Sequence, residues 1–395
     1  MMIPLSSSDT RVLILSKDPT LLHEDASFGD SLQRHLDYAH ALNTKAPGSE
    51  LRIITYSPKS NGNHVLNPAR NLKIYGTAST RRFLFLLDAL VLIQRLEAEG
   101  WIPDIITSQS PYEDGQLACW LAKRYEARLI PQLHFDLFSK SWEKESFLNP
   151  LRKVLSMLSL DQAHAIRVVS SAQTEALVKN LGISPSLIHR IPVRVDFQPS
   201  QKSPEECKAS LHPRLVGKKV VLFAGKLYPP KNLPFWMRVA QKIKEIHPQT
   251  EFILAGDGVL ERELKDLGYQ LGLEDSILFL GKVPHHQLRD IYGSADVFLL
   301  TSRHEGFARV LVESSLCAVP SVVSDCAGPR DIIKHEETGF LCPPDDLSSF
   351  VHNILILLND ENKRVQMGYA ARNHVQSLFN QKELTRRLVE LWLKE

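Results

Sequence analysis

Short runs of apolar residues alternate with longer amphipathic segments along most of the chain. In the first half, five apolar runs have the length of buried strands, and four segments between them have helical spacing. The expected strands are 11–16, 51–56, 103–108, 128–133 and 166–170, and the expected helices are 31–43, 80–98, 115–125 and 173–181. Because these strands are almost continuously apolar, we expect a parallel sheet covered by helices on both faces.

The same alternation starts again at residue 219, after a stretch rich in Pro, Ser and charge. The expected strands are 219–224, 251–255, 276–280, 296–300 and 320–324, and the expected helices are 233–246, 260–271, 287–294, 309–317 and 347–358. Residues 361–395 form a final amphipathic helical segment. The sequence therefore predicts an α/β protein with two Rossmann-like, doubly wound parallel-sheet domains, whose ligands bind at the carboxyl ends of the strands, facing across a cleft.

The length of 395 residues also favours two domains, because a single core rarely grows to this size. We expect a first domain over 1–196, a linker over 197–218 and a second domain over 219–378. A C-terminal helix over 379–395 is expected to pack back on the first domain.

Composition and charge narrow the class of protein. The 47 basic and 45 acidic residues nearly cancel, which argues against a general nucleic-acid binder. The five cysteines are scattered without a CxxC pair, which favours reduced thiols in the cytoplasm over disulfides or a zinc site.

No part of the sequence has the pattern of a signal peptide or a membrane span. The N-terminus lacks a basic region followed by a long apolar core. The most apolar run, 83–93, contains Asp88 and is shorter than the about 20 residues that a transmembrane helix needs. Arg81 and Arg82 precede this run and leave peripheral contact with an anionic membrane surface open as an alternative.

The segment 301–320 carries the most specific chemistry. Glu305 follows an expected strand, Gly306 allows a turn, and an apolar helical run then leads to Glu313. Amides of the first helical turn at Ala308, Arg309 and Val310 would have no partner within the helix and would face an anion. The two carboxylates could accept hydrogen bonds from hydroxyl groups, although two solvated glutamates on a helix would give the same pattern.

Four features in this order resemble a known family. They are the two Rossmann-like halves, GKLYPPKN at 225–232, AGDG at 255–258, and Glu305 and Glu313 separated by seven residues. The chain is similar to GT-B glycosyltransferases of family 4, the group 1 type. The resemblance implies a retaining transferase of the hexosyl or N-acetylhexosaminyl class, with the donor bound by the second domain and the acceptor by the first.

The resemblance also implies roles for the second domain. Lys226 and Lys231, with Gly225, resemble the basic clamp on the donor diphosphate, although the family usually carries Arg at the position of Lys226. Asp257 and Gly258 resemble the floor of the nucleotide site.

Around the helix start, Glu305 matches the acid that binds the donor sugar, and Glu313 matches the acid that contacts the ribose. The turn that holds the phosphates is matched by Gly306, Phe307, Ala308, Arg309 and Val310.

In the first domain, His134 at a strand end resembles the histidine that contacts the donor sugar. Gly29, within Phe28–Asp30, resembles the loop that approaches the donor phosphate. Asp30 stands there in place of a usual second glycine.

The expected reaction needs no metal and no cofactor besides its UDP- or GDP-linked donor sugar. The chain has no two aspartates in a DxD arrangement, and Lys226, Lys231 and a helix N-terminus can neutralise a diphosphate instead. The leaving phosphate oxygen is expected to take the acceptor proton. The acceptor is a glycan, a lipid-linked molecule or another hydroxyl compound, which suggests polysaccharide biosynthesis in the cytoplasm or at the cytoplasmic membrane face.

Three other classes of protein share parts of this sequence pattern. A nicotinamide oxidoreductase lacks support because Glu261 stands where a GxGxxG fingerprint needs its third glycine. An epimerase of the GT-B type acting on a nucleotide sugar stays open, as does a non-catalytic protein that binds sugar nucleotides.

Overall fold

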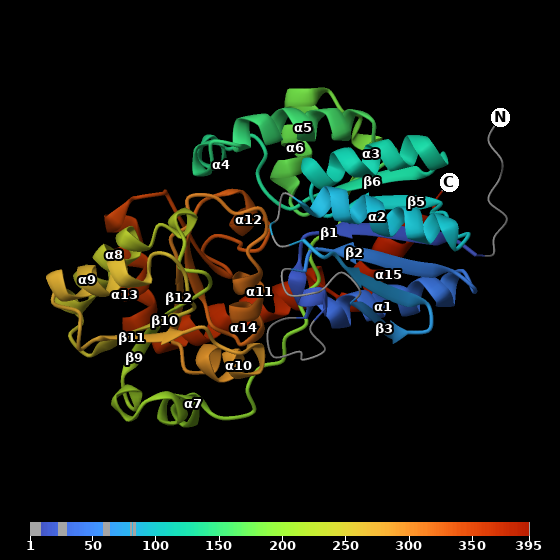
Figure 1. The fold of residues 1–395 in the computed structure, drawn as a ribbon. Helices are drawn as coiled ribbons and strands as arrows, with labels where there is room; N and C mark the ends of the chain where they lie inside the picture. The colour runs from blue at the N-terminus through green and yellow to red at the C-terminus, as the bar shows by residue number, and fades with distance from the viewer. Residues whose placement is uncertain (1–8, 23–29, 58–63, 80, 82–83, 395) are drawn as a thin grey trace. The chain divides into compact units, whose positions relative to one another are not determined.

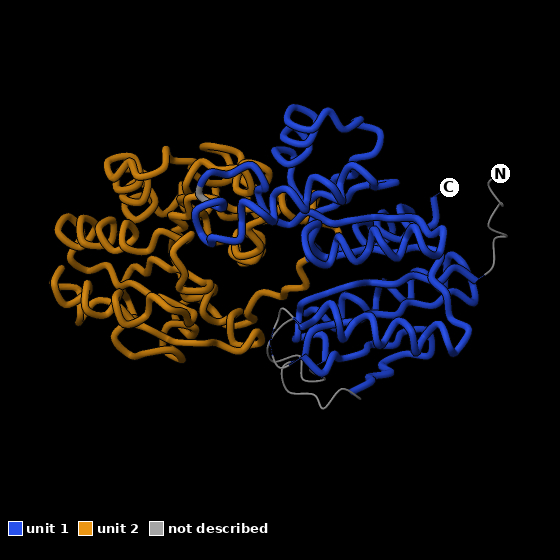
Figure 2. The backbone as a smooth tube through the Cα atoms, turned by 45° about the horizontal axis from the view of Figure 1, so that its top comes forward, with its two compact units in different colours: residues 1–194, 381–395 blue, residues 195–380 orange. Residues whose placement is uncertain are grey.

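The computed structural model describes residues 9–22, 30–57, 64–79, 81 and 84–394. The chain divides into two compact units, which Figure 2 shows in blue and orange. Unit 1 comprises residues 1–194 and 381–395, and unit 2 comprises residues 195–380.

Unit 1 is built on a sheet of eight strands in the order β3-β4-β2-β1-β5-β6-β7-β8. The strands are β1 (Arg11–Ser16), β2 (Glu50–Thr55), β3 (Val65–Ala69), β4 (Leu72–Gly76), β5 (Ile105–Ser108), β6 (Arg128–Leu133), β7 (Ile166–Val168) and β8 (Ile188–Arg190). Neighbouring strands are parallel except β3 and β4, which pair antiparallel at one edge.

Helices cover both faces of this sheet. They are α1 (Ser31–Lys45), α2 (Phe85–Ala98), α3 (Glu113–Tyr125), α4 (Lys140–Glu145), α5 (Asn149–Asp161), α6 (Ser171–Leu181) and α15 (Gln381–Leu393). Figure 1 shows α2 and α3 on one face and α1 with α15 on the other. The ring of Trp392 in α15 packs edge-on against Tyr38 of α1, with 6.0 Å between centroids. The C-terminal helix therefore belongs to unit 1.

Unit 2 is built on a six-stranded parallel sheet in the order β11-β10-β9-β12-β13-β14. The strands are β9 (Lys219–Ala224), β10 (Thr250–Ala255), β11 (Ile277–Gly281), β12 (Val297–Leu300), β13 (Ser321–Ser324) and β14 (Gly339–Cys342). Counted within the unit this order is 3-2-1-4-5-6, that of dinucleotide-binding folds, and the chain changes direction across the sheet between β9 and β12.

The helices of unit 2 follow the strands along the chain. They are α7 (Pro204–Leu211), α8 (Leu233–Ile246), α9 (Glu261–Gln270), α10 (His285–Gly293), α11 (Arg309–Leu316), α12 (Ala327–Arg330), α13 (Leu347–Asn359) and α14 (Glu361–Leu378). Short 3-10 helices lie at Pro19–Leu22, Pro185–Leu187, Pro213–Leu215 and Pro229–Lys231.

The predicted fold class, two doubly wound parallel-sheet domains, is confirmed. The segment 197–218 differs from the expected free linker, because it lies in unit 2 and contains α7. A capping box formed by Ser203 and Glu206 starts this helix. Cys207 of α7 is fully buried near Gly293 of α10. The segment is therefore packed structure and not only a connection.

No helix among the described residues is long and apolar enough to cross a lipid bilayer.

Two loops at the carboxyl edge of the second sheet lie directly against each other. The loop after β9 and the loop after β10 exchange backbone hydrogen bonds, from Gly225 N to Ala255 O at 2.9 Å and from Leu227 N to Asp257 O at 2.8 Å. A Cβ atom on Gly258 would lie 2.4 Å from the carbonyl oxygen of Leu227. Position 258 therefore requires glycine, because the atoms that a Cβ there would meet belong to the backbone of Leu227.

Replacing Gly258 with Ala should destabilise unit 2, because the backbone at Leu227 must move away from the added methyl group. We expect the free energy of unfolding to fall by about 1–3 kcal/mol, as for other overpacked sites. Gly268→Ala in α9 is the control, because its Cβ would meet only the Met237 methyl group, at 3.3 Å. Urea denaturation of both variants measures the difference, and equal stabilities would contradict the steric account.

Candidate functional site

The centre of the site lies where the second sheet changes direction. Lys231 follows β9, Glu305 follows β12, and these two strands are neighbours in the sheet. The Lys231 ammonium forms an ion pair with Glu305 Oε1, which also accepts a hydrogen bond from Ser302 Oγ at 2.7 Å. Open α/β sheets bind their ligands at this kind of position.

The backbone around this ion pair is fixed by contacts from neighbouring loops. Thr301 Oγ1 donates to the carbonyl oxygen of Lys231 at 3.0 Å and lies 3.2 Å from that of Asn232. Asn232 has a left-handed backbone with φ of 52°, and its amide group donates to Asp345 Oδ1 at 2.8 Å. The site is therefore held in place by bonds outside the ion pair.

The backbone of Glu305 is also held by α12, the short helix that follows β13. The backbone N–H of Gly328, in the segment after β13, donates to the Glu305 carbonyl oxygen at 3.0 Å. Among the described residues, no donor is bonded to the second carboxylate oxygen, Glu305 Oε2. Glu305 can therefore accept a hydrogen bond from a ligand hydroxyl without losing Lys231.

The N-terminus of α11 begins three residues after Glu305 and presents uncapped backbone amides. No side chain caps the helix at Ala308, and its first turn contains no acidic residue. The Arg309 N–H is bonded to the Phe307 carbonyl at 3.2 Å. A helix N-terminus without an acidic cap favours an anionic ligand, because its amides and dipole both stabilise negative charge.

Glu313 lies deeper, in the buried part of α11. The residue is only 5% exposed, and its Oε2 accepts a hydrogen bond from the Tyr292 hydroxyl of α10 at 2.9 Å. Burial and the charge of Glu313 raise the pKa of Tyr292 well above its usual value, so this hydroxyl stays a donor. Oε1 lies 3.8 Å from the Arg309 guanidinium. Tyr292 orients the carboxylate, and nothing in the sequence pattern linked it to Glu313.

The remaining expected donor-side residues lie on the surrounding loops. Lys226 is exposed, and no described ion pair joins it to the Lys231–Glu305 pair. Asp257 is exposed. Gly225 and Gly258 take part in the packing of the two loops described above. The ring of Phe307 packs edge-on against Phe379 at 5.5 Å.

Two expectations concern the N-terminal loop of unit 1. Gly29 and Phe28 lie outside the described residues. Asp30 precedes α1 and is 3.4 Å from the Arg34 guanidinium one helical turn later. Asp30 therefore has a structural partner at the start of α1.

His134 follows β6 at the carboxyl edge of the first sheet. Its Nε2 atom lies 3.1 Å from Gln132 Oε1. Arg167 NH1, which can only donate, lies 2.8 Å from the same oxygen. That atom of Gln132 must therefore be the carbonyl oxygen, so His134 Nε2 carries the proton and Nδ1 is an acceptor.

The charge of His134 is set by its surroundings. Burial, together with the positive charges of the Arg167 and Arg34 guanidinium groups, lowers its pKa to about 3. Since the protonated form exists only below that pKa, His134 is neutral at neutral pH. It can bind a ligand hydroxyl but cannot serve as a charged clamp.

Arg167 is a residue of this edge that the sequence reasoning missed. Its side chain is 4% exposed and donates to three oxygens, of Ile191 at 3.0 Å, Pro192 at 3.1 Å and Gln132 at 2.8 Å. No carboxylate among the described residues forms an ion pair with it. The feature of the sequence that could have identified Arg167 is its position inside the apolar run 166–170.

Two further observations concern groups that could bind a metal and the thiol nearest the site. No group of three or more His, Cys, Asp or Glu side chains there has the arrangement of a metal site. Cys326 lies near Ser302, and burial, with the charge of Glu305, raises the pKa of its thiol to about 12. The metal-free reaction stays a prediction.

Two family models match different parts of the chain. The model of "Glycosyl transferases group 1" matches residues 211–374, and that of "Glycosyltransferase Family 4" matches residues 38–199. Between them they cover most of both units.

Curated relatives match at moderate identity. An uncharacterized glycosyltransferase of Methanocaldococcus jannaschii is 32% identical over 174 residues, 44% of either chain. The UDP-Gal:alpha-D-GlcNAc-diphosphoundecaprenol alpha-1,3-galactosyltransferase of Escherichia coli is 31% identical over 214 residues, 52% of this chain and 54% of the relative. The chain thus spans about half the length of these relatives.

Solved structures are similar over nearly the whole chain. The sucrose-phosphate synthase of Thermosynechococcus elongatus gives a TM-score of 0.83 at 19% identity, covering 98% of both chains. HepE of Anabaena in complex with UDP and glucose gives 0.76 at 18% identity, covering 98% of this chain and 100% of that one. At these identities the likeness shows the fold, which is the GT-B fold.

Removing the charge of Arg167 should raise the pKa of His134. In Arg167→Met one of the two neighbouring cations is lost, so the protonated ring becomes less unfavourable and its pKa should move from about 3 toward its usual range. Arg167→Lys keeps the charge and is the control. An NMR titration of the histidine ring protons measures both, and identical pKa values in the two variants would contradict this assignment.

Proposed function

We propose that this chain, which belongs to the group 1 family of GT-B glycosyltransferases, transfers a sugar from a nucleotide diphosphate sugar to a hydroxyl group of an acceptor. The observation that carries the proposal is the Lys231–Glu305 ion pair beside the uncapped N-terminus of α11, at the point where the second sheet changes direction. One cation, one carboxylate and a helix N-terminus without a side-chain cap fit a sugar joined to a diphosphate.

In this proposal the diphosphate lies on Lys231 and the α11 amides, with Lys226 as a second cation. Glu305 Oε2 accepts a hydrogen bond from the transferred sugar. Glu313, with one oxygen bonded to Tyr292, offers Oε1 to the ribose hydroxyls. UDP is the favoured nucleotide, because a relative is named for UDP-Gal and a similar structure for its complex with UDP and glucose.

The proposed chemistry is a dissociative transfer that retains the configuration of the anomeric carbon. As the glycosidic bond breaks, negative charge grows on the diphosphate, where Lys231 and the helix amides stabilise it without a metal. The leaving phosphate oxygen takes the proton of the acceptor hydroxyl. Neutral His134 offers Nδ1 as an acceptor to a sugar hydroxyl and, with a pKa of about 3, does not act as an acid.

We further propose a lipid-linked acceptor. The four side chains Phe147, Leu151, Val154 and Leu158, at helical spacing on and before α5, are 90%, 57%, 53% and 50% exposed. An apolar stripe of this kind fits the interfacial region of a bilayer. The Escherichia coli relative is named for a diphosphoundecaprenol acceptor. The reaction then belongs to polysaccharide or glycolipid assembly at the cytoplasmic membrane face.

Replacing Lys231 with Ala should abolish most of the transfer while leaving the fold intact. Losing one preorganised cation should lower kcat by about 10²–10³-fold, as for other groups that stabilise developing charge. The variant should also lose stabilisation by UDP in a thermal-shift assay, which scales with ligand affinity. Lys242→Ala is the control, because Lys242 lies on α8 in an exposed pair with Glu245. Unchanged turnover in Lys231→Ala would refute the assignment.

Product analysis separates the alternatives in the same assay. An epimerase would convert the donor sugar without any acceptor, whereas a non-catalytic binding protein would be stabilised by UDP and form no product. Either result would replace transfer as the function.

The exposed stripe of α5 should control binding to lipid vesicles. Leu151→Ser should reduce co-sedimentation with vesicles several-fold, because about 0.8 kcal/mol is lost for each buried methylene group. Val365→Ser is the control, because Val365 is similarly exposed on α14 of unit 2. Equal co-sedimentation of the wild type and Leu151→Ser would argue against a membrane-borne acceptor.

A further inference from the structure

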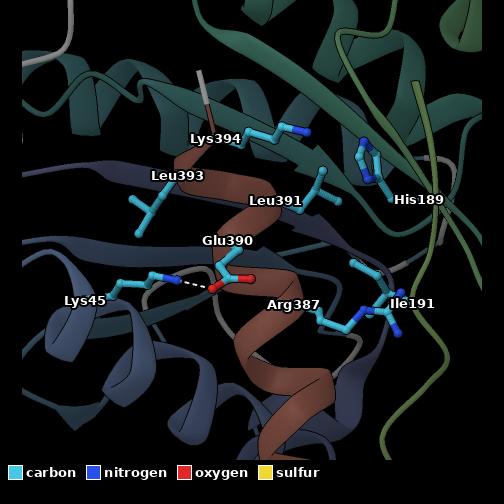
Figure 3. Close-up of a pocket in the computed structure, with 8 residues that line it drawn as sticks. All are labelled: Lys45, His189, Ile191, Arg387, Glu390, Leu391, Leu393 and Lys394. Carbon is cyan, nitrogen blue, oxygen red and sulfur yellow. Dashed lines mark hydrogen bonds and ion pairs between the residues drawn. The ribbon is translucent and has the colours of Figure 1, made fainter. Parts of the chain in front are cut away.

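A cavity of about 460 Å³ lies within unit 1, beside the C-terminal half of α15. Its lining residues come from α1, β8 with the residue after it, and α15 with the residue after it: Lys45, His189, Ile191, Arg387, Glu390, Leu391, Leu393 and Lys394. Only Ile191 also takes part in the site described above, through its backbone carbonyl oxygen, which accepts a hydrogen bond from Arg167. Figure 3 shows Arg387, Leu391 and Lys394 extending from α15 on the same side as His189 and Ile191.

The polar part of this lining carries excess positive charge. Glu390, its only carboxylate, pairs with the Lys45 ammonium and with Arg386 NH1 at 2.6 Å. Within the described part of the chain, no carboxylate forms an ion pair with Arg387 or Lys394. One N–H of Arg387 donates to the Arg190 carbonyl oxygen at 2.6 Å, which leaves the other four of its five N–H groups for a ligand.

The same positive charges act on His189. Burial and the charges of Lys394, Arg128 and Arg387 lower its pKa. The other charged groups of the lining, Lys45 and Glu390, neutralise each other. The ring is therefore neutral at neutral pH, and the cations around it have no compensating anion of their own.

The rest of the lining is apolar. Ile191 and Leu391 are each 3% exposed and form a fixed surface, with Leu393 beside them. The volume lies within the range of about 300–1,000 Å³ that is usual for small-molecule sites. Cations next to the apolar surface of Ile191 and Leu391 favour an anion that has an apolar part over a simple inorganic anion.

We propose that this cavity binds a small organic phosphate monoester. The phosphate oxygens lie on the Arg387 guanidinium and the Lys394 ammonium, and the organic part rests on Ile191 and Leu391. Such a ligand contacts both α15 and the end of strand β8, so its binding stabilises the packing of the C-terminal helix against the rest of unit 1. Arg suits this task because its fork of N–H groups matches phosphate oxygens.

Isothermal titration with phenyl phosphate tests the proposal on the full chain, presaturated with UDP so that any phosphate site of unit 2 is filled. Arg387→Gln and Lys394→Gln should each weaken binding by about tenfold, the usual effect of losing one charge-assisted contact. Lys382→Gln is the matched control, because Lys382 is exposed on the same helix and does not line the cavity. No binding, or equal weakening in all three variants, would overturn the proposal.

Two further readouts locate the ligand. A bound phosphate should raise the pKa of His189 in an NMR titration, because it offsets the charges of Lys394, Arg128 and Arg387. Inorganic phosphate should bind more weakly than phenyl phosphate, because it has no apolar part to cover Ile191 and Leu391. An unchanged His189 pKa, or equal affinities for the two probes, would refute the site. None of these measurements depends on sugar transfer, so the proposed function and this inference can fail separately.

Discussion

The hydrogen bonding of β9 to both β10 and β12 is the constraint on which unit 2 depends. Because β9 comes first in the chain yet lies in the middle of the sheet, successive connections must run outward in both directions. The loops after β9 and β12 therefore lead to opposite sides of the sheet from neighbouring strand ends, and open α/β sheets bind their ligands at this kind of position. Lys231 and Glu305 meet there although 74 positions separate them in sequence.

The regular core of both units could be predicted from the sequence because its periodicity is local. The strands 11–16, 128–133 and 219–224 and the helix 233–246 were predicted to the residue, since each is bounded by a clear change from apolar to polar residues. β3 was missed, because it is a partly exposed edge strand with Pro68 in it and lacks a buried apolar run. α7 was missed because a linker and a short capped surface helix have similar compositions.

The candidate site was predictable only where its residues are close in sequence. Glu305, the uncapped turn and Glu313 lie within nine positions, so strand and helix periodicity places them correctly. The partners that fix their geometry come from other elements. Tyr292 bonds Glu313 from α10, and Arg167 of β7 bonds Gln132 and so sets the tautomer of His134 through the register of β6 and β7. Such pairs depend on which elements become neighbours, which a single sequence does not specify.

The two carboxyl edges differ in how they hold charge, and this difference bears on their chemistry. At the edge of unit 2 a lysine and a glutamate form an ion pair and neutralise each other. At the edge of unit 1 a buried guanidinium is solvated by neutral oxygens alone and keeps the nearby histidine uncharged. A buried charge without a counterion is costly in free energy. The oxygens bonded to Arg167 are neutral and do not cancel its positive charge. This charge favours an anion at that edge and disfavours the protonated form of His134.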